Sequence, residues 1–492
     1  MKGFLYRIAE KFISEYGDGI KDFCFVFPNR RASLFFRKYL GQNSDKPLFS
    51  PLLTTVSDLF ATLSDLQTGD SIELLYILYK EYAALCPSCG ITPESFDEFV
   101  DWGETILSDF NDVDKYMVDA DALFSNIEDL KKLDTDYDFL SDSQKKAVTD
   151  FWKVVLSQTE SFGNKKLFRN TWMLLRQLYA NYNAVLKEKG IAYEGMVFRD
   201  VAEKIRQDST SVATRLKPFK GVVFIGLNAL SEAEKVLCDY VRDSFCGDFY
   251  WDFNGEMITD PDNKASRFLS ENVKRYPSRL EIDTAVDYTP EIEVVSVPSA
   301  VGQAKAAASY LSLSQADETA VILPDEKLLM PLLNSIPEEI EKINVTMGYS
   351  LSNSAFTSLM GMLSSLQLNK RAGAEGVQFY HKDVVSILTH PFIAEAAGEE
   401  ALAIKSDIYQ SNRILYAYNG DTELFKTIFS SVDDCAAVCD WQLSIIDQLA
   451  EGISPLEKEF AYGYYRAIVR IKGLGISMEP RTYFRFLRQI TA

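Results

Sequence analysis

Two short runs of apolar residues constrain the fold of this chain more than any other feature. Residues Phe23–Phe27 (FCFVF) and 221–226 (GVVFIG) are continuously apolar, and each is followed by a turn and then a helical pattern. Such runs are typical of strands that are buried on both faces, as in a parallel sheet covered by helices. Because the two runs lie far apart in the chain, the sheet is expected to contain a large insertion.

Charge is unevenly distributed between these runs. Residues 61–150 carry 21 acidic and 6 basic side chains, whereas residues 151–220 carry 6 acidic and 13 basic ones. Apolar residues recur at helical spacing over residues 72–82 and 99–110, with acidic residues on the other faces. The pattern predicts a mostly helical insertion over about residues 68–190.

A second strand–helix–strand pattern lies further along the chain. Residues 291–297 and 320–323 are strand-like and flank an alanine-rich helical stretch at residues 303–313. This order predicts a second parallel sheet. Residues 252–290, rich in Asp, Asn, Pro and Ser, are expected to connect the two sheets, and helical patterns return after about residue 376.

The residues that an ATPase needs are absent from the sequence. No GxxxxGK[ST] phosphate-binding motif occurs. The second apolar run ends in Ile225, Gly226, Leu227 and Asn228, where a motor ATPase carries adjacent acidic residues that hold magnesium and orient water. ATP hydrolysis by this chain is therefore not expected.

Metal centres and covalent catalysis also lack the necessary residues. The chain has only two histidines, His381 and His390, which gives neither a histidine-based triad nor a zinc site. Cys86 and Cys89 have the spacing of metal ligands, but no second pair repeats it. Acid-rich stretches such as residues 134–138 lack the glycine and closing glutamate of a calcium loop. We expect no metal and no cofactor.

The expected location is the cytoplasm. The first 16 residues carry several charges, which excludes the apolar core of a signal peptide, and no run of about 18 apolar residues occurs. The seven cysteines are an odd number spread over 492 residues, which fits reduced thiols better than a disulfide framework. No membrane partner is expected.

The turn after the first apolar run is a candidate phosphate contact. The chain has a net charge of −20, so binding of a nucleic acid would need a local basic surface. Cations and small polar residues gather where the first strand is expected to meet its helix, at Asn29, Arg30, Arg31, Ser33, Arg37 and Lys38. The residues allow two interpretations: a phosphate contact at a helix start, or a basic helix that pairs with the acidic insertion.

The same turn carries a resemblance to superfamily I DNA helicases. Residues 25–40 (FVFPNRRASLFFRKYL) resemble motif Ia, and residues 53–60 (LTTVSDLF) resemble motif Ib. Residues 192–198 (AYEGMVF) are similar to the stretch before the Walker B strand, a position that residues 222–234 occupy. In that family motifs Ia and Ib touch the backbone of single-stranded DNA. The resemblance implies DNA contacts at Asn29, Arg30, Arg31, Ser33, Arg37, Lys38, Thr54, Thr55 and Ser57.

The ATP-side motifs of the helicase family are degenerate. Ile225, Gly226 and Asn228 stand at the Walker B position without the acidic pair, and Pro324 stands near the place of a nucleotide-contacting arginine of motif IV. The chain thus combines DNA-contact motifs that are retained with ATP-site motifs that are missing. This combination resembles that of the AddB-like family, the inactivated-helicase subunits of AddAB-type nucleases. Residues 344–351 and 381–393 resemble a Bacteroides-type branch of it.

This resemblance implies an α/β fold of two degenerate RecA-like domains with large helical insertions. Residues 1–67 plus 190–255 would form the first, split domain (1A-like), and residues 68–189 the helical insertion (1B-like). Residues 256–375 would form the second RecA-like domain (2A-like), and residues 376–492 a helical domain (2B-like).

The implied function is that of a catalytically inactive DNA-binding scaffold in double-strand-break repair, with an AddA-like helicase-nuclease subunit as partner. Family members continue into a PD-(D/E)XK exonuclease domain, and the helix expected from Pro480 ends at Ala492 without a glycine or asparagine cap. We therefore expect the chain to be truncated. Two alternatives stay open: a protein-interaction scaffold that does not bind DNA, and an unrelated α/β nucleotide-using transferase.

Overall fold

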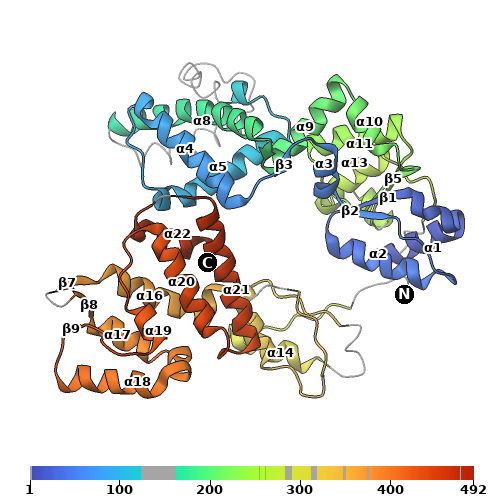
Figure 1. The fold of residues 1–492 in the computed structure, drawn as a ribbon. Coiled ribbons are helices and arrows are strands. Elements are labelled where there is room, and N and C mark those ends of the chain that lie inside the picture. The colour runs from blue at the N-terminus through green and yellow to red at the C-terminus, as the bar shows by residue number, and fades with distance from the viewer. Residues whose placement is uncertain are drawn as a thin grey trace. The chain divides into compact units, whose positions relative to one another are not determined.

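The chain forms two compact units, Met1–Asp287 and Tyr288–Ala492, in the computed structural model (Figure 1). Each unit is described by itself. Side chains between residues 162 and 173 lie outside the description. The structure describes residues 3–123, 162–253, 255–260, 262–282, 291–311, 319–346, 351–373, 376–476 and 478–491.

A parallel sheet of four strands forms the centre of the first unit. The strands are β1 (Phe23–Phe27), β2 (Leu52–Thr55), β5 (Gly221–Ile225) and β6 (Gly247–Tyr250), in the order β2-β1-β5-β6. All residues of β1 and β5 are buried, which confirms the two predicted strands. The chain leaves β1 towards β2 on one side and returns as β5 on the other. Ligands of open α/β sheets bind at such a switch point, beyond the carboxyl ends of the strands.

The two faces of this sheet are covered by different helices. Alternate residues of a strand point to opposite faces. Val223 and Ile225 share a core with Ile8, Phe12 and Phe36, so this face is packed by α1 (Phe4–Tyr16) and α2 (Arg30–Gln42). The helices that follow β4 and β5 are α9 (Glu194–Gln207), α10 (Thr210–Leu216) and α11 (Glu232–Ser244), of which α9 and α11 pack together.

The predicted insertion is helical in the residues that the structure describes. Its helices are α4 (Ser71–Leu85), α5 (Phe96–Lys115) and α8 (Phe162–Lys189). The insertion begins and ends at a short parallel pair of strands, β3 (Gln67–Thr68) and β4 (Ile191–Ala192). This pair marks the ends of the insertion near the expected boundaries of 68 and 190. Predicted helical residues between 124 and 161 lie outside the described residues.

Residues 252–282 pack against the first unit instead of forming an open connector. They include α12 (Gly255–Thr259) and α13 (Arg267–Arg275). Trp251 Nε1 donates to the carbonyl oxygen of Tyr276 at 2.9 Å, and the amide of Arg279 donates to buried Asp248 at 2.9 Å. Residues 256–282, which were expected in the second domain, therefore belong to the first compact unit. The four-part domain assignment itself stays a prediction.

The strands predicted at residues 291–297 and 320–323 are not formed. Both stretches are irregular chain, and only the helix between them is present, as α14 (Ala300–Ser309). The side chain of Val294 is 91% exposed and that of Ile322 is 86% exposed. A strand requires a hydrogen-bonded neighbour, and these stretches have none among the described residues. The small core here joins α14 to α15 (Leu329–Leu333).

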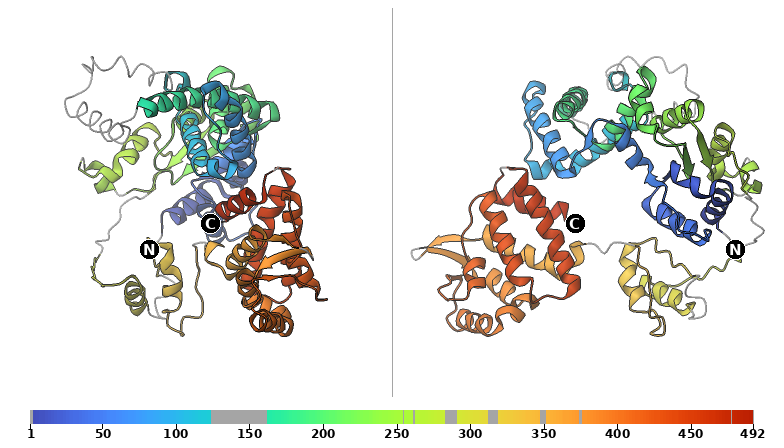
Figure 2. Two further views of the ribbon diagram at one scale, coloured as in Figure 1. Left: turned by 90° about the vertical axis from the view of Figure 1, so that its left-hand side faces the viewer. Right: turned by 45° about the vertical axis from the view of Figure 1, so that its right-hand side comes forward.

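The rest of the second unit is mostly helical, as predicted (Figures 1 and 2). A three-stranded antiparallel sheet of β7 (Arg371–Gly373), β8 (Gly376–Tyr380) and β9 (Leu415–Tyr416) was not expected. The helices are α16 (Ala355–Leu368), α17 (His381–Leu388), α18 (Pro391–Gln410), α19 (Glu423–Ile428), α20 (Cys435–Leu449), α21 (Pro455–Gly473) and α22 (Pro480–Ile490). No helix within the described ranges is long and apolar enough to span a membrane.

Candidate nucleic-acid interface

The carboxyl ends of β1 and β2 bring the two helicase-like segments together. The strands pair in parallel, with Val26 opposite Thr54 and Phe27 opposite Thr55. Residues that follow the two strands therefore lie at the same edge of the sheet. Each strand leads directly into a helix: Asn29 caps α2, and Thr55 caps α3 (Val56–Leu63).

The start of α2 is a local concentration of positive charge. Asn29 Oδ1 accepts a hydrogen bond from the amide of Ala32 at 2.9 Å, and Ser33 Oγ donates to the carbonyl oxygen of Arg30 at 2.7 Å. Arg30 and Arg31 are exposed in the first turn of the helix. The partial positive charge of a helix N-terminus adds to theirs, so the turn favours an anion.

The cations of α2 are weakly engaged within the chain. Arg30 is 83% exposed and lies 3.6 Å from Asp58, which is 49% exposed; such an exposed pair stabilises the fold very little. Arg31, Arg37 and Lys38 are exposed and pair with no acid among the described residues. The described residues thus give no pairing of α2 with the acidic insertion. Arg37 and Lys38 start about 10 Å further along the helix than Arg30, away from the sheet edge.

The hydroxyl groups after β2 are already used within the chain. Thr55 Oγ1 donates to Asp58 Oδ2 at 2.8 Å and accepts from the amide of Asp58 at 3.1 Å. Thr54 Oγ1 lies 3.4 Å from the carbonyl oxygen of Thr55. Ser57 Oγ donates to Glu194. The hydrogen bonds of Thr55 and Ser57 hold the start of α3 in place at this edge of the sheet.

Glu194 links the candidate interface to the helical insertion. It accepts from Ser57 and forms an ion pair with Lys115 of α5 at 2.6 Å. Burial opposes ionisation of this carboxyl group, but the hydrogen bonds from Lys115 and Ser57 outweigh it and lower the pKa of Glu194. The carboxylate therefore remains charged and holds both partners.

The residues on either side of Glu194 also attach α9 to α5. Tyr193 donates to Asp114, and the amide of Gly195 donates to Asn111 Oδ1 at 2.6 Å. A Cβ atom on Gly195 would lie 2.3 Å from the carbonyl oxygen of Asn111, so the close approach requires glycine. The AYEGMVF stretch is therefore a structural junction, a role that its sequence alone did not indicate.

The predicted Walker B position carries no ionisable side chain. Ile225 is completely buried in the sheet core, and Gly226 has a positive φ of 73°. A Cβ atom on Gly226 would lie 3.6 Å from the ring of Phe4 in α1. Asn228 is exposed, and its carbonyl oxygen accepts from Asn272 Nδ2 at 2.6 Å. The place beside β1 where an acidic pair would hold magnesium thus contains an aromatic ring and an aliphatic side chain.

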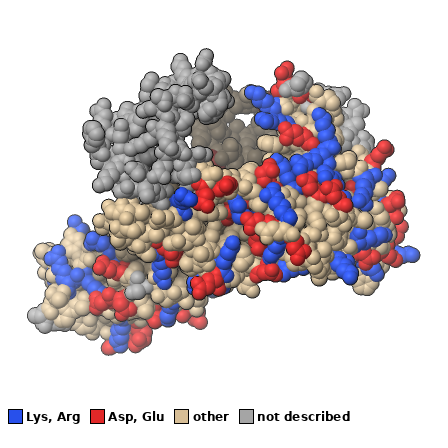
Figure 3. Space-filling model, turned by 90° about the horizontal axis from the view of Figure 1, so that it is seen from above, with Lys and Arg blue, Asp and Glu red and all other residues tan. Residues whose placement is uncertain are grey.

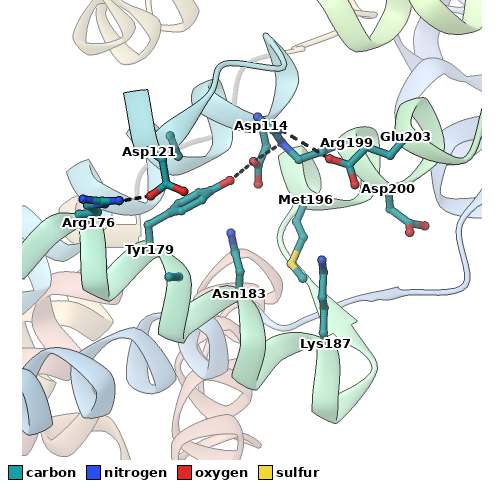
Figure 4. A pocket seen from close by; sticks show the side chains of 12 residues that line it. Asp114, Asp121, Arg176, Tyr179, Asn183, Lys187, Met196, Arg199, Asp200 and Glu203 are labelled. Carbon is teal, nitrogen blue, oxygen red and sulfur yellow. Dashed lines mark hydrogen bonds and ion pairs between the residues drawn. The ribbon is translucent and has the colours of Figure 1, made fainter. Parts of the chain in front are cut away.

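A separate cavity of about 300 Å³ lies between α8 and α9 (Figure 4). Asp114 on its wall is completely buried and faces Arg199 Nε at 2.6 Å, while the phenol groups of Tyr179 and Tyr193 donate to its carboxylate. Burial, followed by the nearby charge of Asp114, raises the pKa of both tyrosines. Arg199 also donates to the carbonyl oxygens of Val113 and Val118. These contacts connect α5, α8 and α9 at the cavity wall.

Four of the nine basic residues of the 151–220 stretch whose side chains the structure describes form ion pairs. Lys204 contacts Asp65 at 2.7 Å and Asp200 at 2.8 Å. Arg176 pairs with Asp121, Arg199 with Asp114, and Arg215 with Asp65. Figure 3 shows blue and red side chains interspersed on the face that it draws. The other five basic residues of this stretch, among them Lys187 and Arg206, have no acidic partner among the described residues.

The geometry of the described residues bears on metal binding, and the buried histidine among them has a structural role. No group of three or more His, Cys, Asp or Glu side chains there is arranged to hold a metal ion. His390 is buried, caps α18, and contacts the carbonyl oxygen of Ala355 at 3.1 Å.

No known protein family and no curated protein significantly matches the sequence.

Proposed function

We propose that this chain is a catalytically inactive, helicase-like scaffold that binds single-stranded DNA in double-strand-break repair. The observation that carries the proposal is the convergence of residues 29–33 and 54–57 at one sheet edge. Both segments were selected from the sequence as DNA-contact motifs, and both precede or begin a helix there. The resemblance extends the proposal to an AddA-like partner subunit and to a C-terminal PD-(D/E)XK exonuclease in the complete protein.

The proposed contact uses the DNA backbone. Arg30 and Arg31 would each bind a phosphate through the planar guanidinium group, next to free amide groups in the first turn of α2. Because the contact between Arg30 and Asp58 is long and exposed, a phosphate can replace it at little cost. Backbone contacts of this kind carry no sequence preference and weaken as salt rises.

The absence of ATP hydrolysis is part of the same proposal. Hydrolysis needs acidic side chains that hold magnesium and orient water at the strand beside the phosphate site. Ile225 and Gly226 cannot supply them, and the ring of Phe4 lies beside this position. DNA binding would therefore be independent of ATP.

The test is a titration of labelled single-stranded DNA across a salt series with Arg30→Glu/Arg31→Glu. The loss of two phosphate contacts should make the negative slope of log K against log salt concentration less steep by about 1 to 2 and weaken binding at low salt. The matched control is Lys21→Glu/Lys217→Glu. It changes the net charge equally, but at exposed positions just before β1 and β5, at the opposite edge of the sheet.

The control variant should keep the slope of the unmodified protein. Equal losses in both variants would show that overall charge governs binding and would refute the edge site. Failure of the unmodified chain to bind DNA would favour a protein-interaction scaffold. Saturable binding of a nucleotide or sugar nucleotide would favour the transferase alternative.

A further inference from the structure

Helix α22 has an all-arginine exposed face. Arg481, Arg485 and Arg488 are exposed, and the sequence PRTYFRFLRQI contains no acidic residue. The opposite face is apolar and packs into the second unit through buried Tyr483, Phe484, Phe486 and Leu487. Tyr483 also donates to buried Gln442 of α20 at 2.6 Å, which fixes the orientation of the helix.

Helical geometry places the three arginines on one stripe. They are separated by four and then three residues, so their side chains fall within an arc of about 60°. The axial steps between them are about 6 Å and about 4.5 Å. Three guanidinium groups can therefore contact one extended polyanion at the same time.

Two arginines of this stripe have no acidic partner in the described part of the chain. Some other cations of the second unit have an acidic partner, for example Lys370 with Asp433 at 2.6 Å, whereas others, such as Lys305, have none among the described residues. No described acid pairs with Arg481 or Arg488, although the chain has 71 acidic and 51 basic residues. The helix dipole favours a cation at Arg488, in the last turn, but disfavours one at Arg481, in the first turn.

We propose that Arg481, Arg485 and Arg488 form a second nucleic-acid contact that binds backbone phosphates. No large apolar side chain is exposed on the described residues of α22, and a protein-binding surface would need an apolar centre. Arginine also suits phosphate, which it binds through two parallel hydrogen bonds. The inference rests on the proposed function only for the class of polymer, because its residues belong entirely to the second unit.

The experiment compares Arg481→Glu/Arg485→Glu/Arg488→Glu with Lys305→Glu/Lys327→Glu/Lys342→Glu in the full chain. The three lysines are exposed, belong to the same unit, and have no described ion-pair partner, so both variants gain the same negative charge. Labelled single-stranded DNA is titrated across a salt series. The arginine variant should make the negative slope of log K against log salt concentration less steep by about 2, because about 0.7 is lost per phosphate. The lysine variant should leave it unchanged.

Parallel measurements separate this inference from the sheet-edge site. If Arg30→Glu/Arg31→Glu keeps its affinity while the α22 variant loses it, the edge site is wrong and the α22 contact stands. If the α22 variant binds like the lysine control, the α22 contact is refuted. Polyglutamate serves as a second probe, and an equal loss of polyglutamate binding would assign the stripe to an acidic protein surface instead. If thermal melting shows that the glutamate variant is unfolded, Arg→Gln replacements at the three positions should give the same loss of slope.

Discussion

Residues 221–225 and residues 291–297 are both short stretches rich in Val and Ile, but they have opposite fates in the molecule. The first is strand β5, completely buried between β1 and β6. The second is irregular chain whose side chains are mostly exposed. The sequence GVVFI is apolar throughout, whereas EIEVVSV places a glutamate at its first and third positions. Burial on both faces requires continuity of apolar residues, which only the first stretch has.

The two stretches also differ in the strands and helices that surround them. Strand β5 has a hydrogen-bonded neighbour on each side and contributes Val223 and Ile225 to a large aromatic core. The helix that follows residues 291–297 is α14, whose buried residues are only Ala304 and Ala308. Strand propensity thus becomes a strand only where packing and pairing partners exist.

The largest expected difference is in core truncation. Phe25→Ala should lower the free energy of unfolding by about 3 to 5 kcal/mol, because it leaves a cavity in the centre of the sheet. Val294→Ala should change it by less than about 0.5 kcal/mol, because the side chain is 91% exposed. Denaturant unfolding of the two variants measures both values. A cost for Val294→Ala close to that for Phe25→Ala would show that residues 291–297 form a packed strand.

A smaller effect is expected at two helical glycines, one in each unit. Gly195→Ala should destabilise the first unit by about 1 to 3 kcal/mol, because its Cβ atom would overlap the backbone of Asn111. Gly361→Ala in α16 should stabilise the second unit by up to about 1 kcal/mol, because nothing lies within 4 Å of the new atom. Thermal melts should shift in opposite directions. A neutral Gly195→Ala would contradict the close junction of α5 and α9.

The smallest effect concerns pH and the second unit, which contains both histidines. Burial lowers the pKa of His390 in the folded state. As pH falls, His390 takes up a proton in the unfolded chain before it does so in the folded chain. Its contribution to the free energy of unfolding is therefore complete above the pKa that His390 has in the unfolded chain, and it is lost as pH falls below that pKa. The free energy of unfolding should therefore be lower at about pH 5.5 than at about pH 7.5.

His390→Asn isolates that contribution. Asparagine can still cap α18 but does not titrate. Carboxylates that titrate in the same range contribute to both proteins and cancel in the difference. Unfolding free energies measured at both pH values should therefore differ less for the variant than for the unmodified protein. Identical pH dependence would refute the coupling of His390 to folding.

The sequence was sufficient for features that depend on local pattern. Continuous apolar runs predicted β1 and β5, helical spacing predicted α4 and α5, and Pro480 marked the start of α22. Local pattern did not predict interactions between distant residues. Arg199 and Asp114 lie 85 positions apart, and neither neighbourhood indicates the other. The docking of residues 256–282 on the first unit depends on similar long-range contacts.

The candidate interface shows the same division. Its cations at Arg30 and Arg31 were identified from the turn after an apolar run, and parallel pairing at Phe27 and Thr55 brings the two motifs to one edge. The commitment of Ser57 to Glu194 was not foreseen, because the two residues are 137 positions apart. The antiparallel sheet of β7, β8 and β9 was also missed, since its strands are short and only partly buried.

Hydrogen–deuterium exchange with and without single-stranded DNA at low salt tests the central proposal most directly. The amides of Arg30 and Arg31 lie before Ala32, whose amide is capped by Asn29, and they should exchange rapidly in the free protein. Bound DNA should slow exchange at residues 30, 31, 56 and 57, and addition of ATP and magnesium should change nothing at residues 225–228. Unchanged exchange at residues 30 and 31 with saturating DNA, or protection of residues 225–228 by ATP and magnesium, would contradict the account.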